Sequence, residues 1–118
     1  MKRIIAALLF STAAACAGTT EVMYRAPLPT QTSMVEIDPG VYVVAGQDEP
    51  VFYADNFYWR YHDNAWYRTG GSTGDWIRIG RPPQSVMQIR EPHRYRHYRP
   101  HSSDTVVIRD QRGRWHRR

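Results

Sequence analysis

The run of aromatic residues between positions 41 and 79 constrains the fold of this chain more than any other feature, because it holds 10 of the 15 aromatic side chains. Short apolar stretches rich in valine, tyrosine and tryptophan alternate there with turn residues, a pattern typical of an antiparallel meander. Residues 84–89 fit either a helical turn or an irregular edge. The sequence thus predicts a mostly β fold, a small antiparallel meander of about five strands. We expect these strands at residues 41–45, 51–54, 57–62, 65–69 and 76–79.

Two Asp-Asn pairs, at positions 55–56 and 63–64, set the register of the predicted hairpins, because both residue types tolerate the left-handed backbone that two-residue loops need. Facing residues share one side of the sheet, and the sides alternate along each strand. The expected facing pairs include Tyr53 with Tyr58, Tyr61 with Trp66 and Arg60 with Tyr67. The predicted core face carries Phe52, Phe57, Trp59, Tyr61 and Trp66, with Arg68 at its margin. The opposite face, which we expect to be exposed, carries Tyr53, Tyr58, Arg60 and Tyr67.

This second face is the candidate ligand-binding surface of the predicted domain. Exposed phenols around one guanidinium form a flat platform, and such platforms stack on sugar rings or on partner side chains. The alternative is that these residues only stabilise the sheet through cross-strand contacts. A glycan-binding module is therefore one of the functions that the sequence allows.

The first residues of the chain match a secretory signal. A basic pair precedes an apolar run and a stretch of small residues within positions 1–15, which is the usual order of such a signal. The only cysteine, Cys16, follows three alanines directly, and this arrangement resembles the signal of bacterial lipoproteins. The resemblance implies a lipid anchor on Cys16, and Ala17 implies sorting to the outer membrane, facing the periplasm. The alternatives are ordinary cleavage with secretion and an uncleaved apolar helix.

Composition changes along the chain divide it into four segments. Residues 1–15 form the signal peptide, and residues 16–40, rich in threonine, serine, glutamine and proline, predict a lipidated N-terminus with a flexible tether. Residues 41–89 form the small β domain. Residues 90–118 hold 9 arginines against 3 acidic residues, a net charge of +6, whereas residues 16–89 carry −3. We expect the last segment to be a basic tail.

The arginines of residues 90–118 alternate with tyrosine, histidine and tryptophan, a composition typical of binders of polyanions. Export would direct them to anionic lipid, lipopolysaccharide or peptidoglycan of the cell envelope, so we predict no nucleic-acid partner. A disordered solubilising tail is the alternative. Residues 105–108 could add to a sheet as an edge strand. The candidate contact residues for an anionic surface are Arg94, Arg96, Arg99, Arg112 and Arg114.

Three histidines recur at every fourth position of this segment, at His93, His97 and His101. In an extended chain the even spacing would place them on one side, so weak divalent-metal binding is a second alternative function. The arginines between them repel a cation, so we predict no metal and no cofactor.

Catalytic motifs are scarce in the sequence. Lys2 is the only lysine and Cys16 is the only thiol, which excludes a Schiff-base lysine from the processed chain and disulfide frameworks from the whole chain. The glycine-rich residues 70–74 lack the lysine of a phosphate-binding loop. We therefore predict that the protein is not an enzyme.

The aromatic core carries a resemblance. Residues 51–61 read VFYADNFYWRY, and AWYR at 65–68 and WIR at 76–78 follow them. The chain resembles a family of small Gram-negative lipoproteins with a VFY, YWRY and WYR core, many of which end in a Tyr-Arg-His stretch like residues 94–99. The resemblance implies an envelope location and an all-β core, and it implies no site residues. We expect a non-enzymatic envelope lipoprotein with a structural or interaction role.

Overall fold

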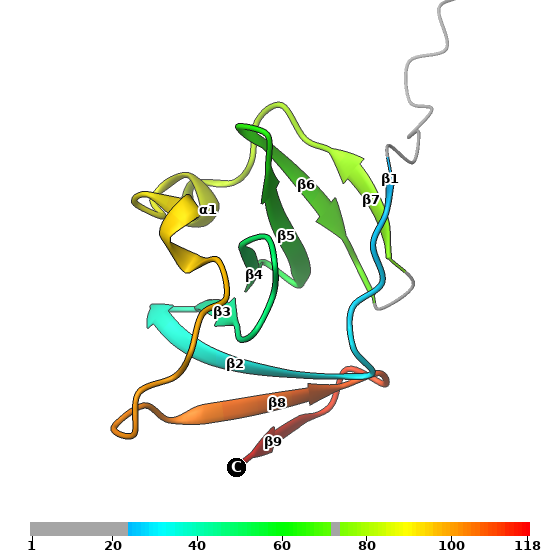
Figure 1. Ribbon diagram of the computed structural model, residues 1–118. Helices are drawn as coiled ribbons and strands as arrows, with labels where there is room; N and C mark the ends of the chain where they lie inside the picture. Colours follow the sequence, from blue (N-terminus) through cyan, green and yellow to red (C-terminus); the bar gives the residue numbers. More distant parts are fainter. Residues whose placement is uncertain (1–23, 72–73) are drawn as a thin grey trace, which may run out of the picture.

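The computed structural model describes residues 24–71 and 74–118. The predicted signal peptide, Cys16 and the first part of the predicted tether lie outside the described residues. In the described part, nine antiparallel strands form one sheet in the order β1-β7-β6-β5-β4-β3-β2-β8-β9 (Figure 1). The predicted mostly β fold is confirmed, with more strands than the five expected.

The strands are β1 (Tyr24–Arg25), β2 (Gln31–Asp38), β3 (Val41–Val44), β4 (Val51–Ala54), β5 (Phe57–His62), β6 (Ala65–Thr69), β7 (Asp75–Arg78), β8 (Val106–Asp110) and β9 (Trp115–Arg117). The helical elements are α1 (Gln84–Met87) and the 3-10 helix η1 (Pro92–Tyr95). The five expected strands correspond to β3 through β7, and β4, β5 and β6 have the predicted bounds. Of the two structures that residues 84–89 fit, the helical turn is the one that forms.

The hairpins on either side of β5 have the predicted register. Tyr53 faces Tyr58 across β4 and β5, and Arg60 faces Tyr67 across β5 and β6. The four loop residues adopt positive φ angles between 49° and 66°, as a two-residue hairpin loop requires. The two Asp-Asn pairs therefore fix which residues share a face of the sheet.

The prediction that residues 24–40 belong to a flexible tether is wrong. Residues 31–38 form β2, which pairs with β3 on one side and with β8 on the other. Thr32 and Met34 are buried on one face of the sheet and Val35 on the other. The chain before β2 runs from β1, at the β7 edge, along the sheet to the start of β2 (Figure 1).

The prediction of a separate basic tail after residue 90 is also wrong. Strand β8 pairs with β2 over five residue pairs, and β9 pairs with β8. Residues 106–110 thus add to the sheet as a strand, and this part of the chain is not a disordered tail, but β9 and not β8 occupies the edge. Tyr95 and Tyr98 pack on the core. The folded unit of the described chain thus extends well beyond residues 41–89.

Both faces of the sheet are covered by other parts of the chain. The first face buries Phe52 and Trp59 together with Val86 of α1, and the segment that contains α1 and η1 lies over it (Figure 1). The second face buries Tyr58 and Trp76, and Leu28, from the segment between β1 and β2, packs against them. A single sheet therefore supports two cores.

Candidate functional site

The expected sugar-stacking platform lies inside the protein. Tyr53, Tyr58 and Arg60 are only 8%, 3% and 7% exposed, and Tyr67 is partly buried. The prediction placed these residues together on one face, which is confirmed, but the prediction that this face is exposed is wrong. Hairpin register decides which residues share a face, and the remaining chain decides what covers that face. No flat aromatic platform is offered to a glycan by these residues.

Arg60 is a buried cation that is surrounded by aromatic rings. Its guanidinium carbon lies 4.6 Å from the ring centroid of Trp76 and 6.0 Å from that of Tyr24. Burial raises the pKa of the Tyr24 hydroxyl to about 12, although the nearby Arg60 opposes this rise. None of the ion pairs among the described residues includes Arg60, so cation–π contacts provide its compensation.

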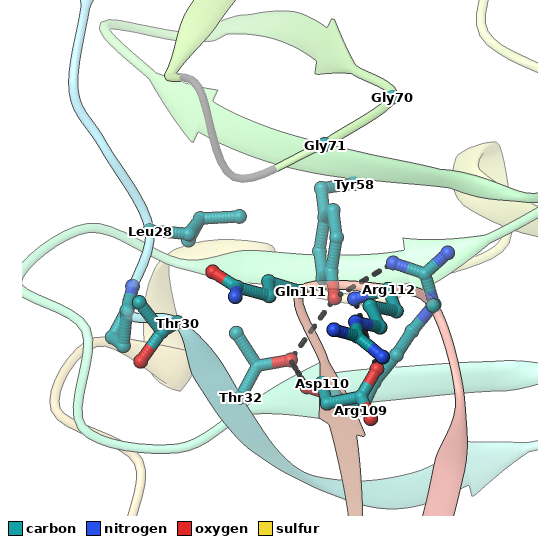
Figure 2. Close-up of a pocket in the computed structure, with 12 residues that line it drawn as sticks. Leu28, Thr30, Thr32, Tyr58, Gly70, Gly71, Arg109, Asp110, Gln111 and Arg112 are labelled. Atoms are coloured by element: carbon teal, nitrogen blue, oxygen red, sulfur yellow. Dashed lines mark hydrogen bonds between the residues drawn. The ribbon is translucent and has the colours of Figure 1, made fainter.

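A second buried polar cluster joins three strands of the sheet. The hydroxyls of Thr32 on β2 and Tyr58 on β5 share a hydrogen bond of 3.0 Å. Nη1 of Arg109, on β8, donates to the Tyr58 hydroxyl at 3.2 Å (Figure 2). In a flat sheet β5 and β2 would stand about 14 Å apart, because two strands lie between them. The sheet must therefore curl to bring these residues together.

The guanidinium of Arg109 packs against two aromatic rings at this point. Its central carbon is 4.8 Å from the ring centroid of Tyr53 and 5.4 Å from that of Tyr58. Its Nε is buried and has no hydrogen-bond partner among the described residues. Gly113 makes room for the side chain, since a Cβ at Gly113 would lie 3.0 Å from Nη2 of Arg109.

A pocket of about 160 Å³ opens beside this cluster (Figure 2). It is smaller than the roughly 300–1,000 Å³ typical of sites for drug-sized ligands, so it suits a small chemical group. Its polar wall is formed by the hydroxyl cluster and two arginines, and Leu28 lies on the opposite side. The lining residues include Leu28, Thr32, Tyr58, Arg109 and Arg112.

The carboxylate of Asp110 also lines the pocket, but it is already engaged by the turn that follows β8. Its Oδ1 accepts the backbone N–H groups of Arg112 and Arg114, each at 2.9 Å. Its Oδ2 lies 3.0 Å from Nε2 of His116 and 3.2 Å from Nε of Arg114. These contacts, that of His116 first, hold the pKa of the Asp110 carboxyl well below its usual range. The carboxylate is thus largely compensated within the turn.

Two more pockets adjoin the first around the start of β2, one of about 310 Å³ and one of about 370 Å³. Gln31 lines both of these, and Thr32 lines the first pocket as well as the 310 Å³ pocket. Five arginines line these three pockets, which share part of their walls. We call these five residues the arginine surface: Arg99, Arg109, Arg112, Arg114 and Arg118.

The arginine surface contains only part of the predicted contact set. Arg99, Arg112 and Arg114 belong to it, whereas Arg94 pairs with Glu91 at 3.0 Å and Arg96 donates to a backbone oxygen of residue 48. Arg109 and Arg118 were missing from the predicted set. The run of β-branched residues at 106–108, followed by the turn sequence DQRG at 110–113, was the signal of the hairpin that carries Arg109 and leads to Arg118.

The structure does not bring the three histidines of the predicted weak metal site together. His97 lies 3.5 Å from Asp48, and the backbone N–H of His101 donates to Asp104, while His93 lines a different hollow. The 3-10 turn η1 and the positive φ of His97 break the even spacing on which the prediction rested. Across residues 24–71 and 74–118, no group of three or more histidine, cysteine or acidic side chains is gathered as for a metal ion.

Comparisons with known proteins gave no match, whether with protein-family models, with curated proteins or with solved structures. None of the helices in the described part of the chain is long and apolar enough to cross a membrane. The fold and the site therefore define the class to which the chain is assigned: a mostly β protein with one curled sheet and a basic surface on its β2–β8 side.

Proposed function

We propose that this protein is a non-enzymatic lipoprotein of the cell envelope that contacts anionic envelope surfaces through its arginine surface. The arrangement of five arginines around three adjoining pockets is the observation that supports this function best. The signal-like residues 1–15 and Cys16 support the envelope location. The role is one of interaction, since the arginine surface offers binding groups and the sequence offers no nucleophile motif.

An ordered scaffold makes the arginines effective as a binding surface. Arg99, Arg112, Arg114 and Arg118 are exposed. The turn between β8 and β9 holds Arg112 and Arg114, and Arg118 lies at the other end of this hairpin, where its backbone N–H donates to the oxygen of Val106. A disordered tail would lose conformational entropy on binding, whereas a folded hairpin has lost most of it already. Each arginine near an anionic membrane contributes about 1 kcal/mol, reduced by salt over a Debye length of about 10 Å at 0.1 M.

Binding to vesicles tests this function. The full chain with Cys16→Ser, which cannot be acylated, is mixed with vesicles of neutral lipid or with vesicles that contain phosphatidylglycerol, and the bound fraction is measured by sedimentation. Neutral vesicles report any insertion of the apolar signal. We expect binding to anionic vesicles that weakens as salt is added.

A matched pair of double variants assigns that binding to the arginine surface. Arg99→Gln with Arg118→Gln should weaken binding by up to about 2 kcal/mol, or roughly 30-fold at low salt. Arg78→Gln with Arg81→Gln removes the same charge from two exposed arginines elsewhere and should change affinity much less. Equal losses in the two double variants, or equal binding to neutral vesicles, would contradict the proposal.

Labelling with palmitate tests the lipid anchor separately. The chain with Cys16 in place should incorporate the label in a Gram-negative host and fractionate with the outer membrane, and Cys16→Ser should abolish the incorporation. If the chain with Cys16 in place stays unlabelled, the lipid anchor is overturned and the arginine surface is the remaining proposed contact with the membrane.

A further inference from the structure

We propose that the pocket formed by Thr32, Tyr58, Arg109 and Arg112 binds a phosphate group, in the form of a phosphomonoester or inorganic phosphate. This inference rests on the proposed function and names the chemical group that the arginine surface would bind at Arg109 and Arg112. It concerns a site built from β2, β5, β8 and the turn after β8, which the curled sheet brings together.

The protein leaves part of the hydrogen-bonding capacity of Arg109 unused. A guanidinium has five N–H donors. In the described residues Arg109 donates one side-chain hydrogen bond, to the Tyr58 hydroxyl, and its buried Nε meets no acceptor. The Nε of Arg60 is unpaired in the same way, and aromatic rings contact both guanidiniums. Arg109 differs because it lines a pocket, where its remaining N–H groups can meet an acceptor that the protein itself does not supply. Phosphate oxygens are acceptors whose geometry matches the arginine fork.

The positive charge of the pocket also favours a phosphate group. Arg109 has no carboxylate within ion-pair distance in the part of the chain that the structure describes, and the same holds for Arg112. Asp110 is turned into its own loop and is compensated by Arg114 and His116. The pocket therefore presents two uncompensated positive charges. A phosphomonoester carries about −1.5 to −2 near neutral pH, which matches them, whereas a single carboxylate or phosphodiester carries less.

The size and shape of the pocket suit a phosphate group. At about 160 Å³ the pocket admits a tetrahedral oxyanion, and it is too small for an oligosaccharide or a nucleotide. The hydroxyls of Thr32 and Tyr58, 3.0 Å apart, lie in the same wall as the two arginines (Figure 2). The hydrogen bond between the two hydroxyls leaves at most one of their protons for a ligand, and the free N–H groups of the guanidiniums supply the other donors that phosphate recognition uses. The rest of the ligand would extend over the adjoining pockets.

The test is a calorimetric titration of the full chain carrying Cys16→Ser with inorganic phosphate. Arg112→Gln should weaken phosphate binding about tenfold or more, because it removes one of the two charges from the pocket. Arg112 is exposed and its side chain makes no hydrogen bond to the described residues, so this variant should fold like the parent. Arg78→Gln removes an exposed arginine outside the pocket and should leave the affinity unchanged.

A second variant, Thr32→Val, tests the contribution of the hydroxyls to the pocket. Thr32→Val preserves the shape of the side chain and removes its hydroxyl, and it should weaken phosphate binding several-fold while the arginines stay in place. Its unfolding curve, measured alongside, shows whether the protein remains folded. Loss of phosphate affinity in a folded Thr32→Val variant supports the site, whereas unchanged affinity in both Arg112→Gln and Thr32→Val would overturn it.

Vesicles distinguish the source of the phosphate group. Vesicles with phosphatidic acid carry a phosphomonoester, and phosphatidylglycerol vesicles adjusted to equal surface charge carry only a phosphodiester. Preference for phosphatidic acid, abolished by Arg112→Gln and by added phosphate, supports a lipid-linked source. Phosphate binding without that preference supports a soluble source.

Failure of this inference differs from failure of the proposed function. No binding of inorganic phosphate, together with equal affinity for the two anionic vesicles, would overturn the phosphate site and leave the surface function standing. No binding to any anionic vesicle would overturn the surface function.

Discussion

Replacing Gly74 with alanine tests how the segment between β1 and β2 closes the sheet. Gly74 has a φ of +82°, and a Cβ there would lie 2.5 Å from the backbone nitrogen of Pro27. The positive φ costs an alanine about 1–2 kcal/mol, and the clash with backbone, which cannot rotate away, costs a further ~1–3 kcal/mol. Gly74→Ala should therefore lower the free energy of unfolding by about 2–5 kcal/mol, a large part of the ~5–15 kcal/mol typical of a domain.

Gly46→Ala is the matched control for this experiment. Gly46 has a similar φ of +72°, but a Cβ there meets nothing within 4 Å, so only the backbone term of about 1–2 kcal/mol applies. Urea unfolding followed by tryptophan fluorescence measures both variants, and Trp76 reports directly because its Nε1 donates to the oxygen of Ala26 at 2.9 Å. Equal destabilisation of the two variants would refute the close packing of the segment on Gly74.

Three further predictions follow from the burial and charge of particular groups. Deleting residues 90–118 should abolish cooperative unfolding in circular dichroism, because β8 and the packed Tyr95 are lost; a sharp transition in the shortened chain would show that they are dispensable. Alkaline titration of phenolate absorbance should show a tyrosine with a pKa of about 12 that is missing from Tyr24→Phe. The raised pKa of Tyr24 stabilises the fold fully below pH ~10, and this stabilisation is lost as the pH rises towards 12, so the variant should show a weaker alkaline loss. Because the pKa of Asp110 is lowered in the folded protein, its carboxylate stabilises the fold above pH ~4, and this stabilisation is lost on further acidification. Asp110→Asn should therefore flatten the acid limb of the plot of unfolding free energy against pH; parallel plots for the variant and the parent would contradict this.

Local sequence signals were sufficient to predict the central hairpins. The Asp-Asn pairs dictate two-residue loops, and once a loop length is known the period of two assigns every side chain to a face. Tyr53, Tyr58 and Arg60 are on one face for this reason, and the structure has them there. This part of the prediction needed no information from distant residues.

What covers each face could not be predicted in the same way. Thr32 and Arg109 are 77 residues apart in the sequence, and no turn signal relates them. Strand β2 has five polar residues among eight and no apolar alternation, and the arginines of residues 106–117 resembled a solvated tail. Burial of a tyrosine face by such segments depends on long-range pairing, which is why the exposed platform was predicted wrongly.

The sequence predicted which type of residue forms the candidate site, but it did not predict how these residues are arranged in space. Arg112 and Arg114 were recognised from charge alone, whereas Arg109 acquires its role from the curl of the sheet, which places it against Tyr58. A cluster that draws on β2, β5 and β8 has no contiguous sequence signature. The structure was needed to separate the arginine surface from Arg94 and Arg96, which lie elsewhere.

The most direct test of the proposed surface is a map of backbone amide signals by NMR as the Cys16→Ser chain is titrated with lipid nanodiscs. With anionic discs the account predicts line broadening concentrated at the start of β2 and in residues 99–118, reversed by added salt. Neutral discs should leave these signals unchanged. Broadening centred instead on α1 or on the turn between β5 and β6, or equal broadening with neutral discs, would contradict the account.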